Sequence, residues 1–250
     1  MLFRSGRQAY VGLGGGFGTV NLGRQYSPIF LAADSVDPFD AGIITGQAGS
    51  GTSSDGTLVF FGNFPNRTNN TINYTTNNLG GFTGSVAYSF GEVAGDNTAN
   101  RQLGLSGTYA NGPILATAAY HKANDLAGNA TKNAFIGGTY DFTVVKAAAA
   151  YGKNTSDLNT VDTKTWMLGV TVPVGPGNIL GSYTHVKNNL VGGGKSNNIA
   201  VGYTYALSKR TNLYTSYSRT ANDANDNAGG LAAGPGLTDK LFNVGIRHKF

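Results

Sequence analysis

The sequence predicts an all-β fold, a transmembrane antiparallel up-and-down β-barrel. Short segments along most of the chain alternate apolar and polar residues, which is the pattern of strands with one apolar and one polar face. Their connections alternate between short turns rich in Gly, Asn or Pro and longer polar loops, as in barrels with turns at one end and loops at the other. The polar faces carry mainly Gly, Ser, Thr and Asn, which suit a water-filled interior better than the solvent face of a soluble sheet.

Thirteen segments have this strand character. The segment 164–172 is representative, because Trp166, Leu168 and Val170 share one face opposite Thr165. Tyrosines tend to end the apolar faces, as expected at a boundary between membrane and water. The predicted strands are residues 7–13, 17–26, 69–75, 82–90, 102–110, 113–121, 133–142, 143–153, 164–172, 177–186, 197–207, 211–219 and 241–250.

The composition fits a single domain over residues 1–250. Cysteine is absent, which excludes disulfides, thiolate metal sites and thiol catalysis. The net charge of +5 is spread along the chain, so no basic block indicates a nucleic-acid partner. No run approaches the roughly 20 apolar residues of a membrane-spanning helix. A mean hydropathy of −0.16 is compatible with a soluble protein and with a membrane β-barrel.

The segment 26–65 departs from the alternating pattern and is the longest connection in the chain. Connections of this length inside an all-β chain are usually functional or disordered. Its acidic residues Asp34, Asp37 and Asp40 lie among apolar residues such as Phe39, which a freely solvated loop does not need. We therefore predict that the segment folds into the interior of the barrel. A disordered surface loop is the alternative.

Four stretches resemble the general diffusion porins of Gram-negative bacteria, in particular their β-proteobacterial branch. They are RQAYVGLGGGFGTVNLGRQYSP, DPFDAG, NRTNNTINYTTNNLGGFTGSVAYSFGE and LFNVGIRHKF. The resemblance implies a sixteen-stranded barrel in the outer membrane, in which a long loop folds inward and narrows the pore. It also implies a homotrimer, contacts with outer-membrane lipid and lipopolysaccharide, insertion by the barrel-assembly machinery, and passage of small ions and hydrophilic solutes.

The beginning of the chain differs from that family. Residues 1–7 have neither the apolar core nor the small-residue cleavage site of a signal peptide, and family members carry about three more strands before this point. Thirteen strands is also an odd number, whereas closed barrels of this kind have an even one. The sequence therefore predicts an N-terminally truncated barrel that lacks part of the family's trimer contact.

In the family, acidic residues on the inward loop face arginines on the barrel wall. Residues that are an even number of positions apart in a strand share a face (they have the same parity). Arg67 has the parity of Asn69 and is therefore expected on the polar face. Arg7 is expected on the same face as the apolar Val11 and Leu13, and Arg24 on the same face as Val20 and Leu22 unless Gly23 breaks the register. Both arginines are therefore assigned to the constriction on the resemblance. The aspartates are also common turn formers. The constriction residues implied by the resemblance are Arg7, Arg24, Arg67, Asp34, Asp37 and Asp40.

The last strand resembles the C-terminal assembly signal of outer-membrane proteins, in which apolar residues alternate and the chain ends in an aromatic one. The residues concerned are Phe242, Val244, Ile246 and Phe250.

The predicted function is passive diffusion of small hydrophilic solutes and ions. A weak preference for anions is expected, because several arginines arranged around a pore attract anions. No nucleophile motif indicates an enzyme, and no cofactor is expected. His121, His185 and His248 lie on separate predicted strands without metal-ligand spacing. A soluble all-β, lectin-like binding domain is the main alternative, and a barrel enzyme is a second one.

Overall fold

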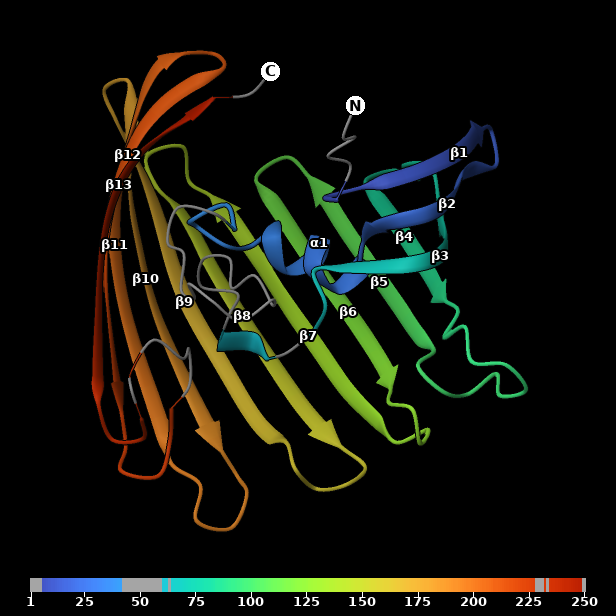
Figure 1. Ribbon diagram of the computed structural model, residues 1–250. Helices are drawn as coiled ribbons and strands as arrows, with labels where there is room; N and C mark the ends of the chain where they lie inside the picture. The colour runs from blue at the N-terminus through green and yellow to red at the C-terminus, as the bar shows by residue number, and fades with distance from the viewer. Residues whose placement is uncertain (1–5, 42–59, 63, 228–231, 233, 249–250) are drawn as a thin grey trace, which may run out of the picture.

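A computed structural model describes residues 6–41, 60–62, 64–227, 232 and 234–248. These residues form thirteen strands and one helix, and the strands make one antiparallel sheet in which each pairs with its sequence neighbours. The sheet curves around the helix, which lies on its concave side (Figure 1). The elements are β1 Ala9–Gly15, β2 Gly18–Tyr26, α1 Pro28–Asp34, β3 Arg67–Thr75, β4 Phe82–Ser89, β5 Gln102–Asn111, β6 Ile114–Asn124, β7 Ala130–Asp141, β8 Lys146–Ser156, β9 Asp162–Val174, β10 Gly177–Asn188, β11 Lys195–Ser208, β12 Thr211–Asn222 and β13 Thr238–His248.

The predicted all-β fold of thirteen strands is confirmed. Because consecutive strands are antiparallel neighbours, alternate connections lie at the same end of the sheet. One end carries short turns, such as 112–113 and 209–210, and the other carries the longer loops, such as 90–101 and 223–237. Within the described residues, β1 and β13 each pair with a single neighbour. None of the described helical residues forms a helix long and apolar enough to cross a membrane.

The two faces of the sheet are inverted relative to a soluble β-domain. In β9, Leu168 and Val170 are 57% and 43% exposed, whereas Thr165 is fully buried. The same arrangement recurs along the sheet, where large apolar side chains project outward and small or polar ones inward. Exposed outward residues include Val11, Leu13, Ile72, Val86, Leu105, Ile136, Ile199, Val201, Phe242, Val244 and Ile246. A soluble sandwich would bury these side chains, whereas a membrane barrel turns them toward lipid.

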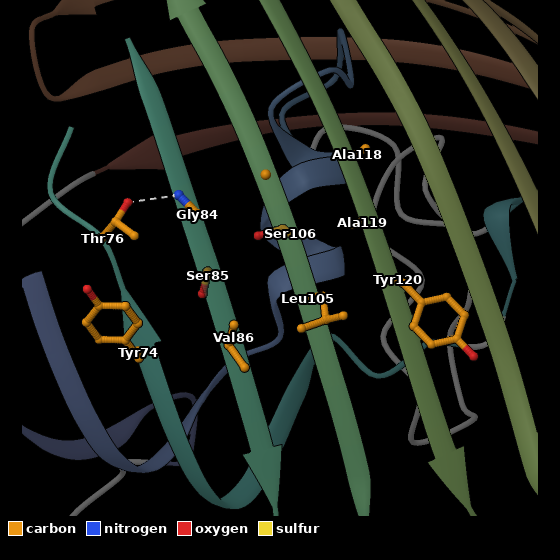
Figure 2. Close-up of a pocket in the computed structure, with 11 residues that line it drawn as sticks. Tyr74, Thr76, Gly84, Ser85, Val86, Leu105, Ser106, Ala118, Ala119 and Tyr120 are labelled. Carbon is orange, nitrogen blue, oxygen red and sulfur yellow. Dashed lines mark hydrogen bonds between the residues drawn. The ribbon is translucent and has the colours of Figure 1, made fainter. Parts of the chain in front are cut away.

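Figure 2 shows this apolar surface at the sheet formed by β3–β6. Tyr74, Val86, Leu105 and Tyr120 come from four consecutive strands and line a shallow hollow of about 350 Å³. Small residues such as Ser106 lie between them. The outward face is therefore apolar but uneven, which lipid chains can follow more readily than a rigid partner.

The concave side holds the apolar core of the molecule. Ile29, Phe30 and Val36 from the inward segment pack with Phe135 and Met167 of the wall in one buried cluster. A second buried cluster forms where Phe39 meets Leu180 and Ala200. The described parts of segment 26–65 thus lie inside the curve of the sheet (Figure 1), and burial of their apolar side chains holds them there.

Four wall glycines make room for this segment. A Cβ atom on Gly104 would lie 2.9 Å from Pro28 Cδ, and one on Gly152 would lie 2.8 Å from Phe61 Cδ1. A Cβ on Gly202 would lie 3.0 Å from Phe39 Cε1, and one on Gly169 would approach Pro38 still more closely. The wall is therefore thinnest where the inward segment contacts it, and four different strands contribute to the fit.

Helix α1 lies in segment 26–65, where the sequence analysis predicted no helix or strand. At seven residues, α1 is too short to show a repeated apolar stripe. Its start signal is nevertheless present, because the Ser27 hydroxyl accepts a hydrogen bond from Phe30 N at 3.2 Å and Pro28 occupies the first turn.

The outward apolar face yields a test that separates a membrane barrel from a soluble β-domain. Val201→Arg in the middle of β11 should lower the free energy of unfolding in lipid vesicles by about 2–4 kcal/mol. Val191→Arg, in the loop 189–194, is the matched control and should have little effect, since Val191 is at least as exposed as Val201. Equal effects of the two substitutions in urea titrations would contradict the membrane assignment of this face.

Candidate pore constriction

The inward segment ends in a turn that is held against the wall by Asp37 and Phe39. The Asp37 carboxylate accepts hydrogen bonds from Phe39 N at 3.1 Å and Ala41 N at 3.3 Å. The Phe39 side chain is fully buried in the second apolar cluster. Asp40 and Ala41 have φ angles of 54° and 42°, a left-handed conformation that Asp tolerates better than most residues. Together these features direct the Asp40 carboxylate toward the last strand.

Asp40 forms an ion pair across the interior with Arg247 of β13. Arg247 Nη1 donates to Asp40 Oδ2 at 2.7 Å, and the two side chains are 58% exposed for Asp40 and 32% exposed for Arg247. An ion pair this open to solvent contributes little to stability. Its main consequence is electrostatic, because it fixes a negative and a positive group side by side at the border of a water-accessible space.

That space is a cavity of about 240 Å³ between the turn and the wall. Asp37 and Asp40 border it from the segment, and Lys146 and Arg247 border it from β8 and β13. Hydroxyl and amide groups, including Thr204, complete the lining. Opposite charges that face each other across a narrow aqueous gap create a transverse field, which selects ions and orients dipolar solutes.

The sequence analysis did not include Lys146 or Arg247 among the site residues. Arg247 had a usable signal, since it has the parity opposite to the apolar Val244 and Ile246. Lys146 shares the inward parity of the buried Ala148. In neither case could the sequence show which carboxylate lies opposite, because Asp40 and Arg247 are 207 positions apart.

Arg7 and Arg67 gather around Tyr26, where the segment begins. Arg7 Nε donates to the Tyr26 hydroxyl at 2.7 Å, and Arg67 Nη2 donates to the same oxygen at 3.0 Å. The two guanidinium carbons lie 5.7 Å and 4.6 Å from the Tyr26 ring centroid, within cation–π range. The ring also stacks on Phe30 of α1 at 4.8 Å. This Tyr26 cluster therefore ties β3 and the residues before β1 to the root of the inward segment.

Arg24 lies apart from that cluster. Its Nε donates to Gly6 O at 2.8 Å and its Nη1 donates to Asn69 Oδ1 at 2.5 Å. The pairing of β2 with β3 shifts between Gly23 and Gln25, which is the register break that the sequence analysis considered for Arg24. Opposite the shift, Asn70 adopts a φ of 50°.

The same shift corrects the parity assigned to Arg67. The sequence analysis grouped Arg67 with Asn69 on the polar face, but Asn69 is exposed whereas Thr68 and Thr71 are both buried. The extra residue in β3 interrupts the period of two, as a bulge does. Arg67 is half-buried, and its position is fixed by Tyr26 rather than by strand parity.

The remaining predicted residues are found at separate places. Asp34 is the last residue of α1 and is half-buried. Phe242, Val244 and Ile246 project outward from β13 and are 69%, 74% and 63% exposed. Phe250 lies outside the described residues. Of the six predicted constriction residues, the structure thus brings Arg7 and Arg67 together and places Asp37 and Asp40 together elsewhere. The described residues contain no cluster of three His, Cys, Asp or Glu side chains arranged to hold a metal ion.

Comparisons with known proteins give consistent results. Residues 3–225 match the sequence profile of a family described as Gram-negative porin. The chain is 31% identical to an outer membrane porin protein of Bordetella pertussis, covering 98% of this chain and 72% of that protein. It is also 31% identical to outer membrane porin protein 32 of Delftia acidovorans, covering 99% and 75%.

Solved structures agree. The anion-selective porin from Comamonas acidovorans superimposes with a TM-score of 0.79 at 30% identity, covering 98% of this chain and 78% of that one. The trimer form of OmpT from Vibrio cholerae superimposes with a TM-score of 0.71 at 15% identity, covering 97% of this chain and 80% of that one. At this identity the similarity supports the fold alone.

The close contact between the wall and the inward segment generates a second prediction. Gly169→Ala would place a methyl group against Pro38, so we expect a loss of stability of about 1–3 kcal/mol from overpacking and a changed single-channel conductance, because the turn that borders the cavity is displaced from the wall. Gly181→Ala is the control, because its nearest new contact is the exposed Val170 side chain at 3.2 Å, and no residue of the inward segment lies within 4 Å of the new Cβ. Unchanged conductance and stability in Gly169→Ala would show that the turn is not seated on this wall.

Proposed function

Because the chain belongs to the Gram-negative porin family, whose members form water-filled channels through the outer membrane, we propose that its pore is narrowest between the Asp37–Asp40 turn and the wall residues Lys146 and Arg247. The chain is an outer-membrane porin for passive diffusion of small hydrophilic solutes and ions. The soluble lectin-like alternative is not favoured, since the exposed face is apolar and the relatives are porins.

The ion pair between Asp40 and Arg247 is the main observation that supports this location of the narrowest part of the pore. It joins the tip of the inward turn to a wall strand more than 200 positions away in sequence, and the adjoining cavity is lined by two acidic and two basic side chains. The Tyr26 cluster lies at the root of the same segment, where Arg7 and Arg67 add positive charge. We propose that segment 26–65 as a whole is the constriction loop of a single domain, 1–250, with Asp34 as a further charge on it and Arg24 as a further charge next to it on β2.

A weak preference for anions is part of the proposal. Around the inward segment, the five positive residues Arg7, Arg24, Arg67, Lys146 and Arg247 outnumber the four aspartates of segment 26–65, which are Asp34, Asp37, Asp40 and Asp55. The relative from Comamonas acidovorans is itself described as anion-selective. Each excess positive charge near the aperture raises the local concentration of anions and lowers that of cations. Solutes move down their own gradient through such a pore, so we propose that the chain carries out no catalysis.

Assembly partners are proposed on the family resemblance. They are a homotrimer, lipopolysaccharide and other outer-membrane lipid, and the barrel-assembly machinery. The outward apolar row of Phe242, Val244 and Ile246 on β13 supports an assembly role for the last strand.

Ion selectivity in planar bilayers tests the proposed constriction. Arg247→Gln should lower the ratio of chloride to potassium permeability, and Asp40→Asn should raise it. A unit charge about 7 Å from a permeating ion contributes about 0.6 kcal/mol in water, so the ratio should change roughly threefold or more. The double variant should return close to the original ratio, because it removes one charge of each sign.

Lys209→Gln is the control for the selectivity test, because it removes one positive charge in the turn 209–210, at the opposite end of β11 from the long loops. Its reversal potential in a salt gradient should match that of the unaltered protein. If Arg247→Gln and Asp40→Asn also leave the reversal potential unchanged, the aperture does not lie beside this ion pair.

A further inference from the structure

The cavity between the inward turn and the wall is bordered by a balanced set of charges. Among the described residues that line it, Asp37 and Asp40 come from the turn, and Lys146 and Arg247 come from the wall. Their formal charges cancel. A solute with a single net charge is attracted by one part of such a cavity and repelled by the other, whereas a solute that carries both charges can be attracted by both.

Lys146 provides the unpaired cation of this cavity. Arg247 is already paired with Asp40, whereas the Lys146 ammonium forms no ion pair or hydrogen bond with the residues that the structure describes. Its register partner on β7 is Asp141, whose carboxylate instead accepts a hydrogen bond from Thr143 N at 2.7 Å. Because Lys146 is exposed, its ammonium can contact an anionic group in the cavity without breaking an existing bond.

Asp40 is the acidic group that a solute can reach. The Asp37 carboxylate is buried and accepts the two backbone N–H groups that shape the turn. The Asp40 side chain, in contrast, is 58% exposed and contacts Arg247 through Oδ2. A carboxylate has about four acceptor sites on its two oxygens, so this open ion pair leaves room for a second cationic partner.

The wall beside Lys146 adds uncharged donors and acceptors. Thr171 pairs directly with Lys146 across β8 and β9, and Asn178 pairs directly with Thr204 across β10 and β11. Thr171 and Asn178 are diagonal neighbours, since Asn178 pairs with Pro173, so the two pairs form one patch. The side chains of Thr171, Asn178 and Thr204 take part in no hydrogen bond within the described part of the chain.

The cavity also has an apolar part. Val36 and Pro38 of the turn and Ala148 and Leu180 of the wall contribute to its lining. Its volume of about 240 Å³ corresponds to roughly eight water molecules at about 30 Å³ each. The cavity therefore suits a small solute that carries both charges and a short aliphatic side chain.

This cavity is displaced along the strands from the arginines of the Tyr26 cluster. Lys146 follows the turn 142–145 at the start of β8, and Arg247 is one residue before the end of β13, so both lie toward the short-turn end. The Tyr26 cluster lies where β2 ends and β3 begins, toward the end of the longer loops. The positive charge that favours anions is thus separated from the balanced cavity, and the two can select different properties of a solute.

We propose that the cavity is a binding site for small zwitterions of the aliphatic α-amino acid class, which pass through the pore by way of this bound state. The inference rests on the proposed function, because the cavity must border the permeation path. The carboxylate of the solute contacts Lys146 and the Thr171 hydroxyl, and its ammonium group contacts Asp40, as charge-assisted hydrogen bonds. Its side chain lies against Val36 and Leu180.

Current fluctuations of the full-length protein in planar bilayers test the proposal, with valine as the probe. Valine should interrupt the open-channel current in a concentration-dependent and saturable manner. Isovalerate lacks the ammonium group of valine, and isobutylamine lacks its carboxylate. Each should bind roughly tenfold or more weakly than valine, because it loses one charge-assisted contact.

Two variants test the two contacts separately. Lys146→Gln should abolish the preference for valine over isobutylamine, because it removes the partner of the carboxylate. Asp40→Asn should abolish the preference for valine over isovalerate, because it removes the partner of the ammonium group. Lys209→Gln is the matched control for the loss of a positive charge, since it lies in the turn 209–210, and it should leave both preferences unchanged.

Three results would overturn the proposal. They are equal binding of the three probes, an unaltered preference for valine in both Lys146→Gln and Asp40→Asn, and equal weakening by Lys209→Gln, which would assign the effect to the overall charge of the pore. The same recordings keep the channel function separate. Normal conductance steps without saturable binding of valine would refute the amino acid site alone, whereas absence of steps from the unaltered protein would contradict the channel.

Discussion

The alternation of side chains across one continuous sheet is the constraint on which the rest of the structure depends. In the hydrocarbon layer no water is available to hydrogen-bond the backbone, so each strand must pair with its neighbours. The period of two then separates side chains onto two faces that meet different solvents. Leu168 and Val201 project toward lipid while Thr165 and Ser218 project inward. The separation of apolar from polar side chains along the strands follows from this division.

A sheet that is apolar outside and polar inside has no conventional hydrophobic core of its own. The inward segment supplies one, because its side chains Ile29, Phe39 and Phe61 are almost completely buried against the wall. This packing requires space on a face that is otherwise lined by side chains, and glycines at positions such as Gly152 and Gly169 provide it. The ion pair of Asp40 with Arg247 is too exposed to hold the segment in place. Apolar packing therefore positions the turn, and the charges are free to serve the passage of ions.

The sequence was sufficient to predict the structural features that repeat along the chain. It was insufficient to predict those that depend on contacts between residues distant in sequence. The thirteen strands and their two faces follow from local alternation, as in β9, and each strand pairs with the next. Helix α1 was missed because about two helical turns are too few to show a repeated apolar stripe, although Ser27 and Pro28 mark the start of the helix. Counting alternate positions from Asn69 and Thr71 could not determine the face of Arg67, because a register shift between β2 and β3 interrupts the alternation.

The pairing of charges was the least predictable feature. Strand parity indicates whether a side chain points inward, but it does not indicate its height in the barrel or its neighbours across the interior. Arg7 and Arg67 share the hydroxyl of Tyr26, whereas the partner of Asp40 is Arg247 on the last strand. Such contacts are set by where the inward segment ends, and that position depends on the packing of Phe39 rather than on any charge.

The net charge of +5 is a poor guide to ion selectivity in such a protein. Much of the positive charge lies on the outward face, where Lys153, Lys164 and Lys187 stand in register. Charges there are separated from the aqueous interior by the sheet and are partly screened by the ions and headgroups around them. Only the residues that face the interior, such as Lys146 and Arg247, act directly on permeating ions. The same sequence can therefore carry a strongly basic membrane-facing belt together with a pore whose preference for anions is weak.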